Sequence, residues 1–350
     1  MRSKGLTRRD FLKLSAIALS SVAMRPALDN GPVLRKPSDA LGIVRIGSPS
    51  VPIFKEPDYR SDIIRHVGQD EIIYYYEKLV SPLGPFVNPF WYQIDEGYLH
   101  TAYVQPVDTI SNEPVYTIPE GGVLGEITVP LTQSMRNNKF FGWQPLYRLY
   151  YKSVHWITGA GYGPNYGPWY EITDDLMKIK YHVPAQHMRI IPDNELTPIS
   201  PDVPEHLKTV IVNISRQSLT AFEGDEVVMH TEISSGIPSY SPTINGIDTA
   251  TPYGEHRIHM KTPARHMGDA NITSDIYAYE LPGVPWVSFF VDTGVAFHGT
   301  YWHDNYGSQM SHGCVNMRPD EAKWIYRWLM PDIKTDQWFA AGYGSQVFVV

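Results

Sequence analysis

The sequence predicts a mostly β protein, and three observations support this fold class. The chain of 350 residues holds 23 Tyr and 9 Trp, and aromatic side chains of this kind are enriched in strands. It also holds 29 Pro and 27 Gly, which supply many turns between short elements. Runs with helical spacing of apolar residues are few, whereas short apolar runs bounded by turn residues recur along the chain.

A weak internal repeat organises the first half of the chain. The strand patterns Phe90–Ile94 and Leu99–Val107 are followed, seventy-eight residues later, by Pro168–Ile172 and Ile179–Pro184. Each unit places Trp-Tyr in its first strand, as Trp91-Tyr92 and Trp169-Tyr170 do. The repeat predicts two small β-barrels, at residues 38–110 and 111–191, which resemble bacterial Src-homology-3-like domains. The alternative is that two Trp-Tyr pairs coincide in an aromatic-rich chain.

The second half reads as a separate domain behind a linker. Residues 192–205 contain four prolines and predict a linker, which leaves residues 206–350 as the C-terminal domain. Strands are predicted at residues 209–214, 219–222, 226–233 and 255–259, with a hairpin turn at Gly224-Asp225. A helix is expected from Pro319, with Ala322, Ile325, Tyr326 and Leu329 on one face and Pro331 beyond its end.

The only cysteine of the chain, Cys314, lies in a segment suited to nucleophilic chemistry. A free thiol is only a few per cent ionised near pH 7, so it needs a base or a positive field to become a nucleophile. His312 lies two residues before it, and His298 ends the apolar run Gly294–Phe297, which predicts a buried strand. A strand, a polar loop and a returning segment would bring His298 against Cys314. Gly313 lacks a Cβ and would let a substrate approach amides able to stabilise an oxyanion.

Two other interpretations of this segment compete with the nucleophile. A lone cysteine is most often an inert, buried small side chain. A zinc site could draw on His298, His303, His312 and Cys314, but their spacings match no compact zinc finger. His303 alone is expected to be a solvated loop residue.

The segment His298-Gly299-Thr300, followed by Ser311-His312-Gly313-Cys314-Val315-Asn316, resembles the signature of L,D-transpeptidases of the YkuD type. The resemblance implies that Cys314 is the acyl-accepting nucleophile and His298 the general base, oriented by the carbonyl of Gly299. It places Ser311, His312 and Gly313 in shaping and oxyanion roles, and Asn316 where many members have arginine. Substrate contacts are expected from Asn316, Tyr301 and Trp302. The upstream turn Thr251–Gly254 and the segment Lys261–Met267 also look family-like, and a cation in that segment would either meet a peptide carboxylate or lie in a solvated loop.

This resemblance implies a β-sandwich catalytic domain with one or two short helices, and an acyltransferase without metal or cofactor. The expected substrates are peptidoglycan stem peptides, as acyl donor and as amine acceptor, joined through a thioester on Cys314. Two alternatives stay open: a cysteine peptidase or carboxypeptidase acting on the same stems, and a non-catalytic envelope-binding protein.

The N-terminus predicts export. Arg8-Arg9 precede Phe11-Leu12-Lys13 and an apolar run to Met24, which resembles a twin-arginine signal peptide over residues 1–27. Cleavage near Ala23 and retention as an uncleaved membrane anchor are both compatible with it. The first 23 residues carry five basic residues and one acidic residue, so the remainder has a formal net charge of −12 against −8 for the whole chain. This charge argues against a nucleic-acid partner, and the expected location is the cell envelope, in the wall or periplasm.

Overall fold

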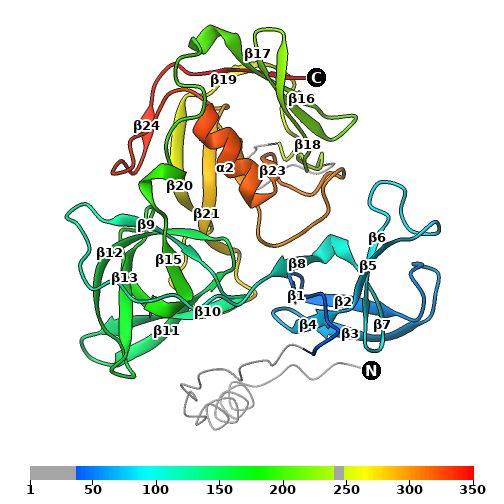
Figure 1. Cartoon of the computed structure of the whole chain (residues 1–350), viewed down its shortest axis with the longest axis horizontal. Coiled ribbons are helices and arrows are strands. Elements are labelled where there is room, and N and C mark those ends of the chain that lie inside the picture. The colour runs from blue at the N-terminus through cyan, green and yellow to red at the C-terminus, as the bar shows by residue number, and fades with distance from the viewer. Residues whose placement is uncertain (1–36, 240–247) are drawn as a thin grey trace, which may run out of the picture. The chain divides into compact units, whose positions relative to one another are not determined.

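The computed structural model describes residues 37–239 and 248–350 (Figure 1). The predicted signal peptide lies outside the described residues. Within the described part, no helix is both long and apolar enough to cross a membrane.

Residues 37–107, called here the N-terminal module, form two sheets around a common core. The three-stranded sheet has the order β4-β1-β8, and the five-stranded sheet has the order β3-β2-β7-β6-β5. The core contains Val44, Ile53, Tyr92, Leu99 and Val104, all buried. The strands are β1 (Gly42–Ile46), β2 (Ser50–Phe54), β3 (Ile63–Gly68), β4 (Ile72–Tyr75), β5 (Glu77–Val80), β6 (Phe90–Ile94), β7 (Gly97–His100) and β8 (Val104–Val107).

Residues 123–190, the middle module, form one seven-stranded sheet with the order β11-β10-β14-β13-β12-β9-β15. Its core is built from buried aliphatic and tyrosine side chains, among them Leu149, Tyr170 and Tyr181. The strands are β9 (Val123–Ile127), β10 (Leu131–Asn138), β11 (Gly142–Tyr150), β12 (Val154–Tyr162), β13 (Pro168–Thr173), β14 (Lys180–Pro184) and β15 (Met188–Ile190).

The internal repeat has a structural counterpart. In each module an antiparallel hairpin, β6–β7 or β13–β14, leads through a short 3-10 turn into a further strand, β8 or β15. The 3-10 turns are η1 (Thr101–Tyr103) and η2 (Ala185–His187). Trp91 and Trp169 are both buried, as core residues of such a unit would be. No sheet of the described residues closes into a barrel, so an Src-homology-3-like identity for the modules stays a proposal.

The C-terminal region consists of two five-stranded sheets and a helix, as the predicted fold class requires. The first sheet has the order β18-β17-β16-β25-β19, and the second has the order β23-β22-β21-β20-β24. The strands are β16 (Lys208–Asn213), β17 (Ser218–Glu223), β18 (Glu226–Glu232), β19 (Gly254–Arg257), β20 (Met260–Gly268), β21 (Glu280–Phe289), β22 (Ala296–Gly299), β23 (Val315–Met317), β24 (Ala340–Ala341) and β25 (Gln346–Val349). The hairpin predicted at Gly224 forms between β17 and β18, with Gly224 at φ +60°.

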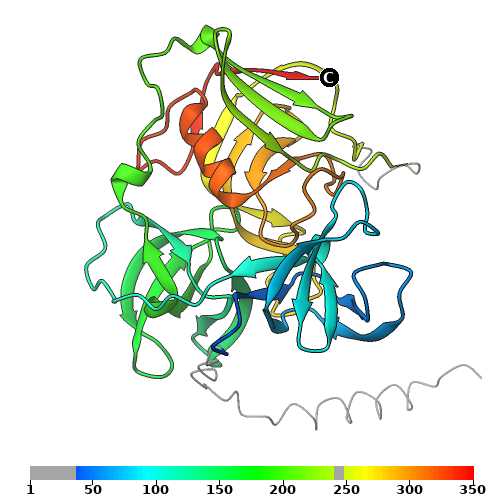
Figure 2. The ribbon, with the colours of Figure 1, turned by 45° about the vertical axis from the view of Figure 1, so that its right-hand side comes forward.

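Helix α2 (Pro319–Trp328) packs on β21 and β22 and lies across the second sheet in both views (Figures 1 and 2). Pro319 occupies its first turn, followed by Asp320 and Glu321, which favours a helix N-terminus. Ala322, Ile325 and Tyr326 are buried, as the helical spacing predicts. The helix thereby shares one apolar core with both sheets of the C-terminal region.

The segment predicted as a linker is anchored along this helix. Ile199 donates its amide to the carbonyl of Arg327, and the Arg327 Nε donates to the carbonyl of Thr197 at 2.7 Å. The predicted linker includes the 3-10 turn η3 (Asp193–Glu195). A second 3-10 turn, η4 (Glu205–Leu207), begins at the last residue of the linker. Leu196 is buried in the core of the C-terminal region. These contacts limit the freedom that a proline-rich linker would otherwise have.

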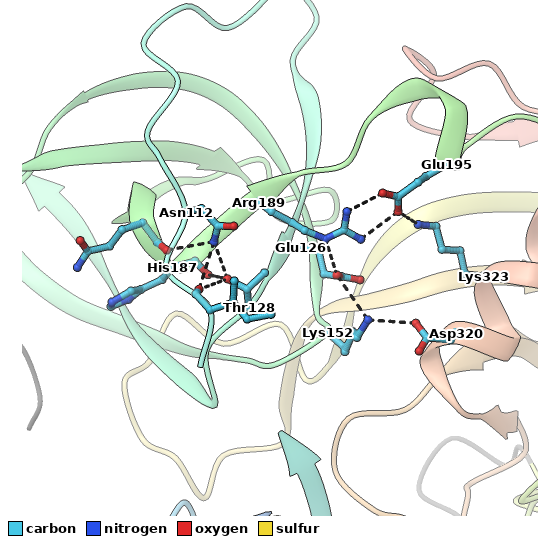
Figure 3. Close-up of polar contacts among 11 residues, drawn as sticks. Asn112, Glu126, Thr128, Lys152, His187, Arg189, Glu195, Asp320 and Lys323 are labelled. Carbon is cyan, nitrogen blue, oxygen red and sulfur yellow. Dashed lines mark hydrogen bonds and ion pairs between the residues drawn. The ribbon is translucent and has the colours of Figure 1, made fainter. Parts of the chain in front are cut away.

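A network of charged side chains joins the middle module to α2 (Figure 3). Lys152 lies 3.1 Å from the carboxylate of Asp320 and 3.7 Å from that of Glu126. Arg189 pairs with Glu126 at 2.9 Å and with Glu195 at 2.8 Å, and Glu195 also accepts from Lys323 on the helix. The helix that follows β23 is therefore held from outside the C-terminal region as well as from within it.

The segment Lys261–Met267 is not a solvated loop but most of strand β20. The ammonium of Lys261 is buried and donates to the carbonyls of Leu329 at 2.6 Å and Pro331 at 2.9 Å. Burial lowers the pKa of this lysine to about 7. Lys261 therefore donates hydrogen bonds to backbone carbonyls just after the C-terminal end of α2, and it is not available to a peptide carboxylate.

Candidate active site

Strands β22 and β23 bring the segments that carry His298 and Cys314 side by side in the second sheet. The two strands are parallel neighbours, with His298 opposite Asn316 and Gly299 opposite Met317. Cys314 directly precedes β23, whose first residue Val315 lies opposite Phe297, the neighbour of His298. The fifteen residues between His298 and Cys314 thus include the crossover between two neighbouring strands.

The imidazole of His298 is held in one tautomer. It is buried, and its Nδ1–H donates to the carbonyl of Gly299 at 3.0 Å, since a carbonyl can only accept. The lone pair is therefore on Nε2, where a general base needs it. Burial lowers the pKa of His298 to about 4, partly opposed by the bond to Gly299. The ring of Trp302 lies 5.8 Å from the imidazole, centre to centre.

Cys314 is a half-buried free thiol directly before β23. Its Sγ lies 3.7 Å from the carbonyl oxygen of Gly294. Desolvation raises the pKa of the thiol to about 11, partly offset by the backbone N–H of Ala296. Among the hydrogen bonds of the described residues, none joins Sγ to His298. Both pKa shifts favour the neutral form, so the thiol and the imidazole are neutral near pH 7 and are not hydrogen-bonded to each other.

The turn before Cys314 is fixed by Ser311. The Ser311 hydroxyl donates to the carbonyl of Cys314 and accepts the amide N–H of Gly313 at 3.2 Å. Gly313 has φ +123°, a region that favours glycine, and its carbonyl accepts from Thr251 Oγ1 at 2.7 Å. The Gly313 amide is therefore paired within this turn. His312 is exposed beside the turn.

Asn316 is held by the side chain of His303. The sequence predicted a solvated His303, but the residue is buried. The two side chains meet at 2.9 Å, between Asn316 Nδ2 and His303 Nε2. Because His303 Nδ1 accepts the amide N–H of Asn305 at 3.2 Å, a neutral ring carries its proton on Nε2. Burial keeps it neutral by lowering the pKa of His303 to about 3. A proton on Nε2 requires an acceptor, so Asn316 should present its Oδ1 to His303.

That amide orientation changes which atom of Asn316 lacks a partner. With Nδ2 toward His303, Asn316 Oδ1 is buried without a hydrogen-bond partner. The reversed amide gives Oδ1 the His303 proton and leaves Nδ2 as the unpaired group. Asn316 would then offer two N–H donors on the face that carries His298.

Tyr301 does not cover the site, contrary to expectation. Its side chain is buried, its hydroxyl donates to the carbonyl of Pro282 at 3.0 Å, and its ring packs against Tyr150 of the middle module at 5.6 Å. Trp302, half-buried and next to His298, remains the better placed of the two aromatic residues.

Tyr279 is a neighbour of the site that the sequence did not reveal. It directly precedes β21, is 54% exposed, and its ring lies 6.3 Å from that of His312. Burial of the hydroxyl and the charge of an ionised Cys314 both raise the pKa of Tyr279. Nothing in the sequence distinguishes this residue among 23 tyrosines, because its partners lie on other segments.

The four residues of the alternative zinc site do not form one. Among the described residues, no group of three or more His, Cys, Asp or Glu side chains gathers closely enough to hold a metal ion. The two buried imidazoles have other partners, since His303 meets Asn305 and Asn316 and His298 meets Gly299.

Comparison with known proteins agrees with the geometry of the C-terminal region. Residues 207–349 match the family model of the L,D-transpeptidase catalytic domain, YkuD. This match covers less than half of the chain and does not include the two modules that precede it. No curated protein sequence matches the chain.

Solved structures of L,D-transpeptidases are similar to parts of the chain. The enzyme from Xylanimonas cellulosilytica is 23% identical over 42% of this chain and 62% of its own, with a TM-score of 0.31. The enzyme from Mycobacterium smegmatis is 20% identical over 50% of this chain and 75% of its own, with a TM-score of 0.32. The catalytic domain from Enterococcus faecium is 24% identical over 41% of this chain and 96% of its own, with a TM-score of 0.30.

Proposed function

We propose that the protein is an exported cysteine acyltransferase, an L,D-transpeptidase that crosslinks peptidoglycan stem peptides or joins them to another amine. One observation carries the proposal: Cys314 directly precedes β23, the parallel neighbour of the strand that carries His298, and the imidazole is held so that Nε2 can accept a proton. The match of residues 207–349 to the L,D-transpeptidase model supports the same reaction class.

In the first half-reaction, Cys314 Sγ attacks the carbonyl carbon of the third residue of a tetrapeptide stem, in the amide that joins it to the fourth. The thiol proton passes to His298 Nε2, and a carbon–sulfur bond forms. The carbon–nitrogen bond then breaks, and the proton moves from His298 to the departing D-amino acid. The product is a thioester on Cys314, and no charge is gained or lost overall.

In the second half-reaction, an amine from a neighbouring stem attacks the thioester. His298 takes a proton from that amine and returns it to the sulfur as the carbon–sulfur bond breaks. Water in place of the amine would give a carboxypeptidase with the same residues, so the nature of the products separates these two functions.

The pKa values favour proton transfer that is concerted with attack. A neutral thiol with a pKa of about 11 beside a neutral imidazole with a pKa of about 4 does not form a resting ion pair. A bound stem peptide displaces water and supplies the carbonyl carbon that the electron pair of the sulfur attacks. The thiolate is then never required as a stable species.

The test compares the wild-type protein with the Cys314→Ala and His298→Ala variants on purified disaccharide tetrapeptides. Mass spectrometry of the products should show crosslinked dimers and released D-amino acid for the wild type, and less than about 1% of either for each variant. His206→Ala is the matched control, because His206 is exposed on another element and should leave activity unchanged. Activity of either site variant equal to wild type would exclude the proposed roles.

The two competing functions are resolved by the same samples. Stem tripeptides without crosslinks would identify a carboxypeptidase. A protein that binds stems but neither releases the D-amino acid nor acquires a carbapenem adduct on Cys314 would be a non-catalytic envelope protein.

A further inference from the structure

Arg45 of the N-terminal module carries a fully buried guanidinium that reaches into the C-terminal region. Its Nη2 donates to the backbone carbonyl of Tyr301 at 2.6 Å and to Gln105 Oε1 at 3.0 Å, while its Nη1 pairs with Asp70 at 2.9 Å. The side chain is 2% exposed. The ring of Tyr150 lies under the guanidinium, 4.1 Å from its carbon to the ring centre.

The carbonyl that Arg45 binds belongs to the crossover between base and nucleophile. Tyr301 is three residues after His298 and is followed directly by Trp302, whose ring faces the imidazole at 5.8 Å. His303, which holds Asn316, comes next. A displacement at Tyr301 would therefore be transmitted to the contacts on both sides of His298.

Other contacts fix the same segment from the same module. Asp304 donates its amide to the carbonyl of Ala102 at 3.1 Å, and Asn88 Nδ2 donates to Asn305 Oδ1 at 3.0 Å. Gly47 approaches the crossover so closely that a Cβ at this position would lie 2.3 Å from the carbonyl oxygen of Trp302. In Figures 1 and 2 the orange crossover after β22 lies beside the blue and cyan strands, as these contacts require.

The charge of Arg45 explains why this contact is specific to arginine. Its carboxylate partner Asp70 is shared with Arg148, at 2.6 Å, so one buried anion serves two guanidinium groups. Carbonyl oxygens therefore have to supply part of the stabilisation that burial takes from the cation. The planar guanidinium carries its donors on separate nitrogens in a fixed fork, so it reaches Asp70, Gln105 and Tyr301 together, whereas a lysine would have to reach them from one nitrogen.

We infer that Arg45 is a positioning residue for the candidate base, and that the N-terminal module completes the active site by holding the crossover 300–305 in place. This inference rests on the proposed function, because its effect is read out at His298 and Cys314. It adds to that function a dependence of the chemical step on a residue more than 250 positions away in the sequence.

The experiment compares Arg45→Met, Arg45→Lys and the control Arg65→Met in the full chain. Arg65 lies in the same module but pairs with Glu96 at the surface. Acylation of Cys314 by a carbapenem is followed by intact mass over a range of concentrations and pH. Thermal unfolding reports whether each variant is folded.

We expect Arg45→Met to lower the maximal acylation rate by about 10- to 100-fold, because small displacements of catalytic groups have effects of this size. Half-saturation should change by less than about threefold, since the drug's own contacts remain. Histidine NMR should show the pKa of His298 rising from about 4 toward the ordinary value as its cover loosens. Arg45→Lys should fall between, and Arg65→Met should match wild type.

Should Arg45→Met fail to fold, Gly47→Ala decides, because it disturbs the crossover at the carbonyl of Trp302 while keeping Arg45. Folded variants with the wild-type acylation rate and His298 pKa would overturn the inference and leave the proposed function intact. A wild-type protein that is not acylated, or is acylated equally well without Cys314, would instead refute the proposed function.

Discussion

The neutral resting state of the site predicts how Cys314 reacts with iodoacetamide as pH is changed. With a pKa of about 11, the thiolate fraction at pH 7 is about 300-fold below that of a free cysteine with a pKa of about 8.5. A thiolate of higher pKa is intrinsically more nucleophilic, which raises its rate constant about 10-fold and offsets part of this difference. Native Cys314 should therefore react about 30-fold more slowly than an unfolded cysteine at pH 7.

The chain provides its own reference for this measurement, because Cys314 is its only cysteine. Protein is alkylated natively and in guanidinium chloride, quenched at intervals and weighed by intact mass spectrometry. The native rate should rise about 10-fold per pH unit from pH 7 to pH 10 without a plateau, as expected below the pKa of about 11. The denatured rate should level off near pH 8.5, the ordinary thiol pKa to within about half a unit.

A variant separates this account from a resting ion pair. His298→Ala should leave the slope of the native profile unchanged, because a neutral imidazole adds no charge beside the sulfur. A native plateau between about pH 5 and 8 that disappears in His298→Ala would show a thiolate–imidazolium pair, and the reasoning from burial would be refuted.

Three further predictions concern stability. Lys261 has a folded pKa of about 7, below its unfolded value, so the unfolded state binds more protons and stability rises with pH. In urea unfolding, the free energy of unfolding of wild type should therefore increase by about 2 kcal/mol relative to that of Lys261→Met between pH 7 and 9. Parallel pH profiles of the two proteins would contradict this. Gly283→Ala should cost about 3 kcal/mol or more, because φ is +72° and the new Cβ would lie 2.2 Å from the ring of His155. The control Gly224→Ala, at φ +60° with open space around it, should cost only about 1 kcal/mol. His266, buried between two carboxylates, has a raised pKa, so the stability of wild type relative to His266→Gln should be full below about pH 6.5 and fall as pH rises through the folded pKa.

Several elements followed from the sequence because their causes are local. Alternating apolar residues and a Gly-Asp turn specify the β17–β18 hairpin, and Pro319 with two following acids specifies the start of α2. The short spacing from His298 to Cys314 allowed a strand, a loop and a returning strand, which β22 and β23 form.

Other expectations failed because burial depends on residues distant in sequence. Lys261 reads as a surface cation until the end of α2 is packed over it, and His303 reads as a solvated residue until Asn316 is placed against it. Tyr301 was expected to contact substrate but is buried against Tyr150 of another module. In each case the neighbouring residues in the sequence give no indication of the partner.

The sequence alone therefore determined the β-rich class, the periodic elements and the motif that contains His298 and Cys314. These features depend on residues that are near one another in the chain. Tertiary structure decided the tautomer of His298, the raised pKa of the Cys314 thiol and the contact of Arg45 with the crossover. The physical reason is that desolvation and buried hydrogen bonds arise only when segments far apart in the chain exclude water together.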